Sequence, residues 1–144
     1  MNPKLIPQER ENYCVCSILQ GIFAKYGLNI SQNEIAGNLT PSNNGHIIYD
    51  GTIKNFLKSK GFDYAFYWHD ETPFNEPDSL LEQISENDGF IAMGIHAYRV
   101  LSFVYPEIIS EDPKDSGRKT FNLYDLMAQL SKLGGGFGLI KKFD

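Results

Sequence analysis

The chain has 144 residues, with 13 Lys and Arg against 18 Asp and Glu, so its formal net charge is −5. Hydrophobic residues make up 42% and aromatic residues 13%, which excludes a disordered chain, and the length suits a single domain over residues 1–144. No apolar run approaches the roughly 20 residues that a membrane-spanning helix needs. The first ten residues lack the apolar core of a signal peptide, so we expect a cytoplasmic protein and leave signal-independent secretion open.

The charge pattern and the cysteines exclude several further classes of protein. Net acidity argues against nucleic acid as the main partner, because no dense stripe of Lys and Arg is available to contact phosphates. Cys14 and Cys16 are the only cysteines, and side chains two positions apart on a helix diverge, so a disulfide between them would be strained. The three histidines are scattered and no second cysteine pair exists, so we expect neither a zinc site nor any other cofactor.

The first half of the chain predicts helices. We expect four of them, at Cys14–Tyr26, from Ser31, at Thr52–Lys60, and from Asp78 or Ser79. Apolar residues recur with helical spacing in the first and third, and Gly27 and Gly61 follow these helices as stop residues. Capping boxes, in which the side chains of the first and fourth residues satisfy backbone N–H groups, begin at Ser31 and Ser79.

The second half predicts mostly strands, at Phe62–Trp68, Phe90–Ile95, His96–Val104, Ile108–Asp112 and Phe137–Ile140, with one helix at Tyr124–Leu133. The continuous apolar run at Phe90–Ile95 is typical of a strand that is covered on both faces. Gly134-Gly135-Gly136 is expected to be a loop that leads into the last strand. Helices first and antiparallel strands later predict an α+β fold, with helices packed on one side of an antiparallel sheet.

Cys14 is the sharpest single feature of the sequence. It lies at the predicted N-terminus of the first helix, where unpaired N–H groups and the helix dipole stabilise an anion and lower the pKa of a thiol. The alternative is that Cys14 simply packs, since free cysteine is among the most buried residue types. We interpret Cys16 as a packing residue of the helix.

Three other residues could complete a site for acyl transfer at a thiol. Gln8 precedes Cys14 by six residues, and its amide could donate a hydrogen bond to an oxyanion beside the backbone N–H of the cysteine. His96 begins one predicted strand and Asp112 ends the next, and neighbouring strands are about 4.8 Å apart, so an imidazole–carboxylate hydrogen bond is expected. Each residue alone has an ordinary structural explanation, but together they supply every role of such a site.

A family resemblance is carried by the stretch Gln8-Glu9-Arg10-Glu11-Asn12-Tyr13-Cys14, followed by Ser17-Ile18-Leu19 and Lys25-Tyr26-Gly27. It resembles the opening motif of the bacteriocin-processing, double-glycine leader peptidases, a family of papain-like cysteine peptidases. The stretch from His96-Ala97-Tyr98-Arg99-Val100 through Glu111-Asp112-Pro113 resembles the histidine strand and the Asp-Pro pair of that family.

This resemblance implies a papain-like fold with N-terminal helices packed on a C-terminal antiparallel sheet. By the same likeness Cys14 is the nucleophile, His96 the general base and acid, and Asp112 orients the histidine. Gln8 is then the donor to the oxyanion.

Two residues depart from the family pattern, since Tyr13 and Val15 stand where members usually have Asp and Gly. These departures bear on the substrate class more than on the acyl chemistry. Leader peptidases are also usually fused to an ABC transporter, for which 144 residues leave no room. We therefore do not infer leader processing for this chain from the resemblance.

The sequence therefore predicts a cysteine peptidase or amidase that hydrolyses a peptide or amide bond through a thioester at Cys14. The expected partner is a peptide or protein substrate, and no regulatory or inhibitor protein is identified. Two alternatives stay open. One is a non-catalytic peptide-binding module of the same fold, and the other is a secreted effector or toxin acting on amides of cell wall or host protein.

Overall fold

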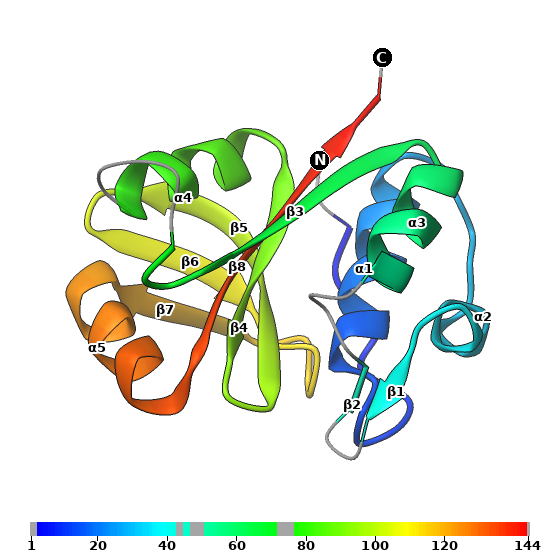
Figure 1. Cartoon of the computed structure of the whole chain (residues 1–144), viewed down its shortest axis with the longest axis horizontal. Coiled ribbons are helices and arrows are strands. Elements are labelled where there is room, and N and C mark those ends of the chain that lie inside the picture. The colour runs from blue at the N-terminus through cyan, green and yellow to red at the C-terminus, as the bar shows by residue number, and fades with distance from the viewer. Residues whose placement is uncertain (1–2, 43–44, 47–50, 72–76, 144) are drawn as a thin grey trace.

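The computed structural model describes residues 3–42, 45–46, 51–71 and 77–143 of the chain (Figure 1). The helices are α1 (Cys14–Lys25), α2 (Gln32–Gly37), α3 (Gly51–Ser59), α4 (Pro77–Glu86) and α5 (Leu123–Leu133). The strands are β1 (Pro41–Ser42), β2 (Gly45–His46), β3 (Phe62–Trp68), β4 (Asp88–Met93), β5 (His96–Val104), β6 (Glu107–Glu111), β7 (Arg118–Asn122) and β8 (Gly135–Lys142). No helix within these ranges is long and apolar enough to cross a membrane.

Six strands form one antiparallel sheet in the order β3-β8-β4-β5-β6-β7, and β1 and β2 form a separate two-stranded ladder. The last strand of the chain, β8, lies between β3 and β4, next to the edge strand β3 (Figure 1). The predicted α+β class is confirmed, and β3 and β5 have the expected bounds.

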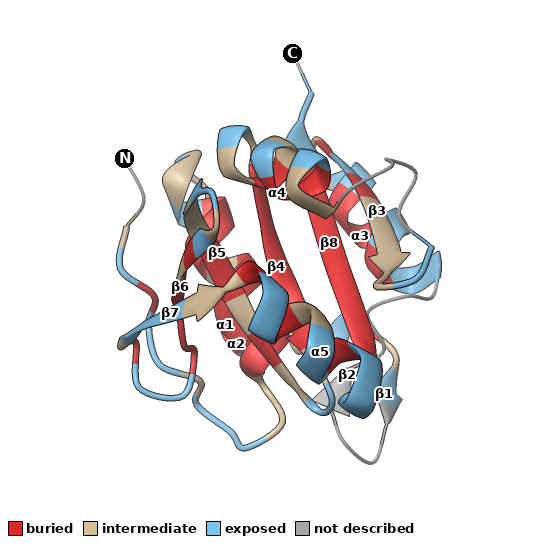
Figure 2. Cartoon of the chain, turned by 90° about the vertical axis from the view of Figure 1, so that its left-hand side faces the viewer, coloured by how far each residue is buried: buried red, intermediate tan, exposed pale blue. Residues whose placement is uncertain are grey.

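Helices cover both faces of the sheet, so the expectation that they lie on one side is wrong. Alternate residues of β4 belong to two different cores: Phe90 and Ala92 pack with α1, α2 and α3, whereas Ile91 packs with α4 and α5. Strands β4 and β8 are buried along nearly their whole length (Figure 2). Because both faces of these central strands are apolar, each face needs a covering layer.

One of the two predicted capping boxes, that at Ser31, is confirmed by the structure. Ser31 caps α2 and its side chain accepts a hydrogen bond from the backbone N–H of Glu34, as the capping box predicts. The capping box predicted at Ser79 is wrong, because α4 already begins at Pro77. Proline suits the first position of a helix, since its φ is helical and no N–H partner is needed there.

Strands β1, β2 and β7 are not predicted from the sequence, and β8 is longer than expected. Strand β7 is polar and its first three residues are exposed, as is common for an edge strand, so it lacks the apolar alternation that reveals a strand. Gly135 and Gly136 belong to β8 and not to a loop, and a Cβ on either would collide with the backbone of Ala92 or Tyr67. The glycines therefore allow close approach of three strands.

Candidate active site

Cys14 is brought to the start of β5 by the packing of α1 against that strand. The buried face of α1 carries Ile18, Ile22 and Phe23, whose helical spacing holds the helix on the sheet. The backbone N–H of Ala97 points at the thiol of Cys14. Residues from distant parts of the sequence therefore place the sulfur beside the residue that directly follows His96.

His96 and Asp112 form a short hydrogen bond, 2.7 Å between Nε2 of the ring and Oδ1 of the carboxylate, as the sequence predicts. His96 is the first residue of β5, and Asp112 directly follows β6, which pairs with β5. Asp112 is buried, whereas the His96 ring is partly exposed. Because Nε2 faces the carboxylate, Nδ1 is the ring nitrogen that can exchange a proton with a thiol.

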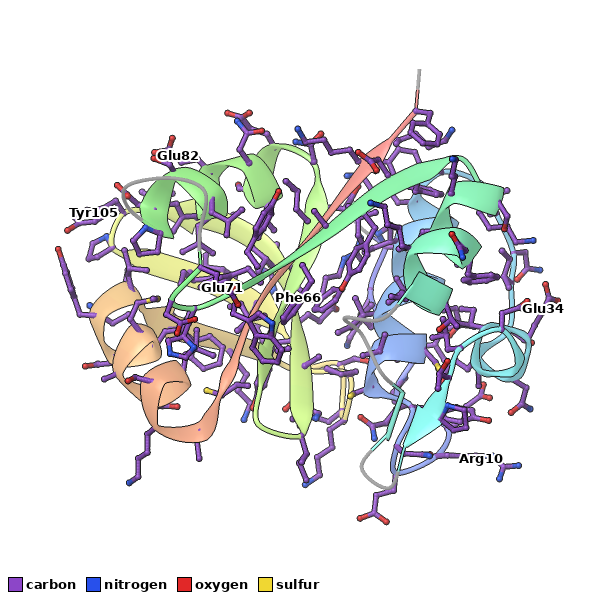
Figure 3. The ribbon with its side chains drawn as sticks, viewed as in Figure 1. Arg10, Glu34, Phe66, Glu71, Glu82 and Tyr105 are labelled. Atoms are coloured by element: carbon purple, nitrogen blue, oxygen red, sulfur yellow. The ribbon has the colours of Figure 1, made fainter. Side chains whose placement is uncertain are left out.

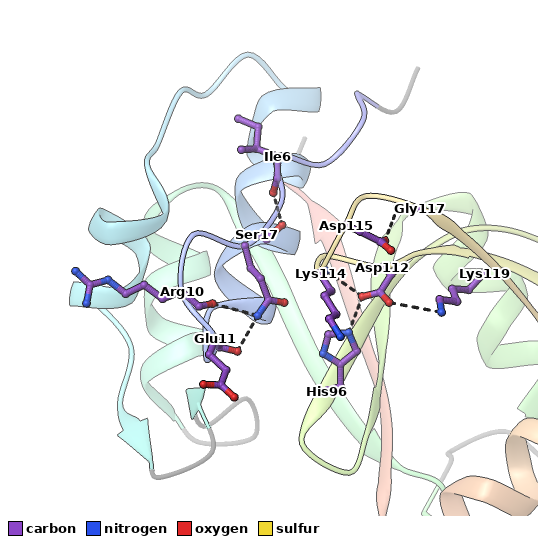
Figure 4. A network of polar contacts seen from close by, with 11 residues as sticks. Ile6, Arg10, Glu11, Ser17, His96, Asp112, Lys114, Asp115, Gly117 and Lys119 are labelled. Atoms are coloured by element: carbon purple, nitrogen blue, oxygen red, sulfur yellow. Dashed lines mark hydrogen bonds and ion pairs between the residues drawn. The ribbon is translucent and has the colours of Figure 1, made fainter.

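The Asp112 carboxylate is held in its ionised form by several contacts (Figure 4). Burial acts to raise its pKa, but the backbone N–H of Lys114, the His96 ring and the Lys119 ammonium together hold the pKa below its ordinary value. The Lys114 N–H donates to Oδ1 at 3.0 Å, and Nζ of Lys119 lies 3.9 Å from Oδ2. An ionised carboxylate next to the ring stabilises a protonated imidazole.

Tyr98 is a member of the site that the sequence analysis did not single out. Its ring lies edge-on to the His96 ring, with centroids 4.8 Å apart, and it also contacts Phe121. Burial, followed by the charges of Asp112 and Cys14, raises the pKa of Tyr98, so its hydroxyl is within electrostatic reach of both. Period-two alternation along the strand could have found it, because residues two apart share one face of a strand.

The pKa of the Cys14 thiol is shifted in the direction opposite to the one expected. The side chain is only 7% exposed, and burial raises its pKa above the ordinary value although the N–H groups of Ala97 and Val15 act against the shift. The predicted lowering of this pKa is therefore wrong, because desolvation outweighs the start of the helix. Burial raises the pKa of Cys16 further, to about 12, and this residue is fully buried as expected for packing.

Gln8 and His96 line one pocket of about 810 Å³, together with residues 9–12, Ile95 and Lys114. The Gln8 amide does not offer its hydrogens to this pocket. Its Nε2 donates to the carbonyl oxygens of Glu11, at 2.7 Å, and Arg10, at 3.1 Å. Its Oε1 is buried and has no hydrogen-bond partner within the described residues.

His69 is not part of this arrangement. Nδ1 of His69 lies 3.2 Å from the carbonyl oxygen of Gly135, at the end of β3. The side chain of His46, like the loop residues Asn43 and Asn44, lies outside the described residues. In the part of the chain that the structure describes, no group of three or more His, Cys, Asp or Glu residues could hold a metal ion.

Comparisons with known proteins give matches among solved structures alone, since no family model and no curated protein matches the chain. The peptidase domain of Streptococcus ComA, a bi-functional ABC transporter involved in a quorum-sensing pathway, superposes with a TM-score of 0.70 at 18% identity. This match covers 96% of our chain and 98% of that domain. A double-glycine-motif protease from an AMS/PCAT transporter, in complex with the leader peptide, has a TM-score of 0.73 at 16% identity, covering 99% and 92% of the two chains. The chain therefore has the fold of the double-glycine leader peptidase domains, as its sequence resemblance implied.

Proposed function

We propose that the chain is a cysteine peptidase or amidase that cleaves a peptide or amide bond through a thioester at Cys14. The observation that carries this proposal is the hydrogen-bonded pair of His96 and Asp112 at the start of the strand whose next residue, Ala97, contacts the Cys14 thiol. A nucleophile, a base and a residue that orients the base are the minimum set for such chemistry.

The raised pKa of Cys14 supports a first step in which proton transfer accompanies the attack of the sulfur. Because the resting thiol keeps its proton at neutral pH, His96 would take that proton through Nδ1 as the sulfur attacks the carbonyl carbon. The carbonyl π electrons move to the oxygen, and the charge of Asp112 stabilises the imidazolium. When the tetrahedral intermediate collapses, the C–N bond breaks and His96 protonates the leaving amine.

Hydrolysis of the thioester completes the cycle with the same residues. His96 removes a proton from water, and the resulting hydroxide attacks the acyl carbon. The C–S bond then breaks, the carboxylic acid leaves, and the Cys14 sulfur recovers its proton from the imidazolium. Atoms and charge balance without any cofactor.

Gln8 would stabilise the oxyanion together with the backbone N–H of Cys14. A donor of this kind is worth roughly 3 kcal/mol of the activation barrier. The amide must first release one loop carbonyl, and the longer bond, 3.1 Å to Arg10, is the weaker of the two. The binding of substrate would therefore be accompanied by a turn of the Gln8 side chain.

The contacts of the two residues that depart from the family pattern are compatible with this chemistry. The Tyr13 hydroxyl donates to Oδ1 of Asn33 at 2.9 Å and its ring lies beneath the Arg10 guanidinium, so the side chain faces α2. Val15 is buried in the core between α1 and the sheet. A peptide segment, as in the leader-peptide complex of the similar protease, remains our proposed substrate class.

A second candidate function is a peptide-binding module that does not cut. It is favoured by the protonated Cys14 thiol and by the Gln8 amide, which gives its hydrogens to loop carbonyls. These features describe the resting chain, however, and a binding module has no need of the His96–Asp112 pair.

Purified wild-type protein and a Cys14→Ala variant, assayed against peptide libraries, a double-glycine leader peptide and cell-wall fragments, test the proposal. We expect cleavage by the wild type and at least a 10⁴-fold loss, on the order of that seen for other covalent nucleophiles, in Cys14→Ala. Cys16→Ala, which removes the neighbouring thiol, should retain activity and serves as the matched control. Equal inertness of wild type and Cys14→Ala, with peptide binding by both, would establish the binding module instead.

A further inference from the structure

Gln32 is a fully buried amide whose hydrogen bonds reach the segment of residues 6–9, here called the Gln8 segment. Its Oε1 accepts from the backbone N–H of Glu9 at 2.9 Å. Its Nε2 faces the carbonyl oxygens of Pro7 at 3.1 Å and Ile6 at 3.3 Å, and also Oε1 of Gln20 at 2.9 Å. The amide therefore holds backbone groups on both sides of Gln8.

A buried amide in the first turn of α2 needs a reason, because burying its polar atoms is costly unless all are hydrogen-bonded. An apolar side chain of the same size could fill the space between α1 and α2 without that requirement. The polar atoms of Gln32 instead match the alternating carbonyl and N–H groups of an extended chain, so they specify how that chain lies on the helices.

The opposite side of the Gln8 segment is tied to the sheet. The backbone N–H of Gln8 donates to the carbonyl oxygen of Pro113 at 2.7 Å, and Pro113 directly follows Asp112. The Ser17 hydroxyl on α1 adds a third anchor, donating to the carbonyl oxygen of Ile6 at 2.6 Å (Figure 4). The segment is thereby held between helices α1 and α2, the first of which carries Cys14, and the loop that carries Asp112.

We propose that Gln32 is a positioning residue for Gln8, and this inference rests on the proposed peptidase function. Gln32 holds the backbone on both sides of Gln8, so that a turn of the Gln8 side chain alone delivers its amide to the oxyanion. Without this clamp the donor moves with its backbone, and displacements of about 1 Å at such groups can cost up to about 10²-fold in rate.

Gln32→Met tests the clamp, because methionine keeps the length of the side chain and removes every hydrogen bond. We expect kcat to fall by about tenfold with KM nearly unchanged, since the clamp serves the transition state. Gln20→Met is the matched control: it removes the bond between the two amides and leaves the bonds of Gln32 to the segment. Its kcat should stay within twofold of wild type.

A double-mutant cycle separates positioning from a general structural role. If Gln32 acts through Gln8, adding Gln32→Met to Gln8→Ala should lower kcat by less than twofold, because the donor that it positions is already gone. The same tenfold loss in both backgrounds would overturn the inference while leaving the peptidase proposal intact. A wild-type protein without activity would contradict the proposed peptidase function itself.

Hydrogen exchange tests the clamp without any activity. The backbone amides of Gln8 and Glu9 should lose about tenfold of their protection in Gln32→Met, and the amides of α1 and β4 should not. Unchanged protection at both amides would overturn the inference. If Gln32→Met does not fold, Gln32→Asn replaces it, since this variant keeps a neutral amide but is one methylene shorter and cannot reach the Glu9 N–H and the Pro7 carbonyl together. Its predicted gain in exchange is again at Gln8 and Glu9.

Discussion

The strand-borne part of the candidate site is assembled, whereas the N-terminal part is not. His96 and Asp112 are hydrogen-bonded at 2.7 Å, and the contacts of Asp112 keep its carboxylate ionised. On the other side, burial holds the Cys14 thiol in its protonated form, and the Gln8 amide faces loop carbonyls. In the mechanism that we propose, the base and its orienting residue are therefore already in place, whereas the Cys14 thiol has still to lose its proton and the Gln8 amide has still to turn.

The two parts also differ in what supports them. His96 is the first residue of β5, and Asp112 directly follows β6, the strand that pairs with β5 in the six-stranded sheet. Gln8 stands on an extended segment without secondary structure, beside the helical side that carries Arg10 and Glu34 (Figure 3). A paired strand fixes a side chain by its ladder, whereas an isolated segment depends on side-chain anchors such as Gln32.

Substitutions in the hydrogen-bonded pair of His96 and Asp112 should have the largest effect on kcat. We expect His96→Ala to lower kcat by about 10⁴-fold, because it removes the general base and acid, and Asp112→Ala to cost less, because only orientation and charge stabilisation are lost. Single-turnover kinetics on a peptide substrate would measure both. Equal losses would contradict the ranking, and an Asp112→Ala variant that does not fold would mean that this residue is a structural part of its turn.

Removing the oxyanion donor should have an intermediate effect. Gln8→Ala is expected to lower kcat by about 10²- to 10³-fold, with a smaller change in KM, since the bond forms only in the transition state. Gln20→Ala removes a glutamine of the same region that does not line the pocket and is the control. If Gln8→Ala keeps wild-type kcat, the Gln8 amide is only a clamp for the loop at Arg10 and Glu11.

The smallest predicted effect is a difference in alkylation rate between the Cys14 and Cys16 thiols. Only the thiolate reacts with iodoacetamide, and both pKa values are raised, so alkylation should be slow at neutral pH and accelerate as the pH rises. More backbone N–H groups act to lower the pKa of Cys14 than that of Cys16, and Cys14 is slightly exposed. Cys14 should therefore be labelled about tenfold faster. Peptide mass spectrometry would measure the ratio, and faster labelling of Cys16 would speak against Cys14 as the nucleophile.

Much of the fold could be predicted from the sequence because its patterns are local. Aromatic content and alternation reveal β3 and β5, and Ser31 reveals the start of α2 through a capping box that spans four residues. The hydrogen bond of His96 to Asp112 is also a local consequence, since two strands joined by a short turn must bring their far ends together. The roles of these residues remain predictions until activity is measured.

What only the tertiary structure decided is the environment of each group. Burial of Cys14 comes from β5, far along the chain, and the resulting desolvation reverses the expected direction of its pKa shift. The helices on the second face of the sheet, the polar edge strand β7 and the clamp by Gln32 likewise depend on contacts between distant segments. A sequence pattern reports which residues can pack or donate, whereas desolvation and hydrogen-bond partners are set by the neighbours that folding brings together.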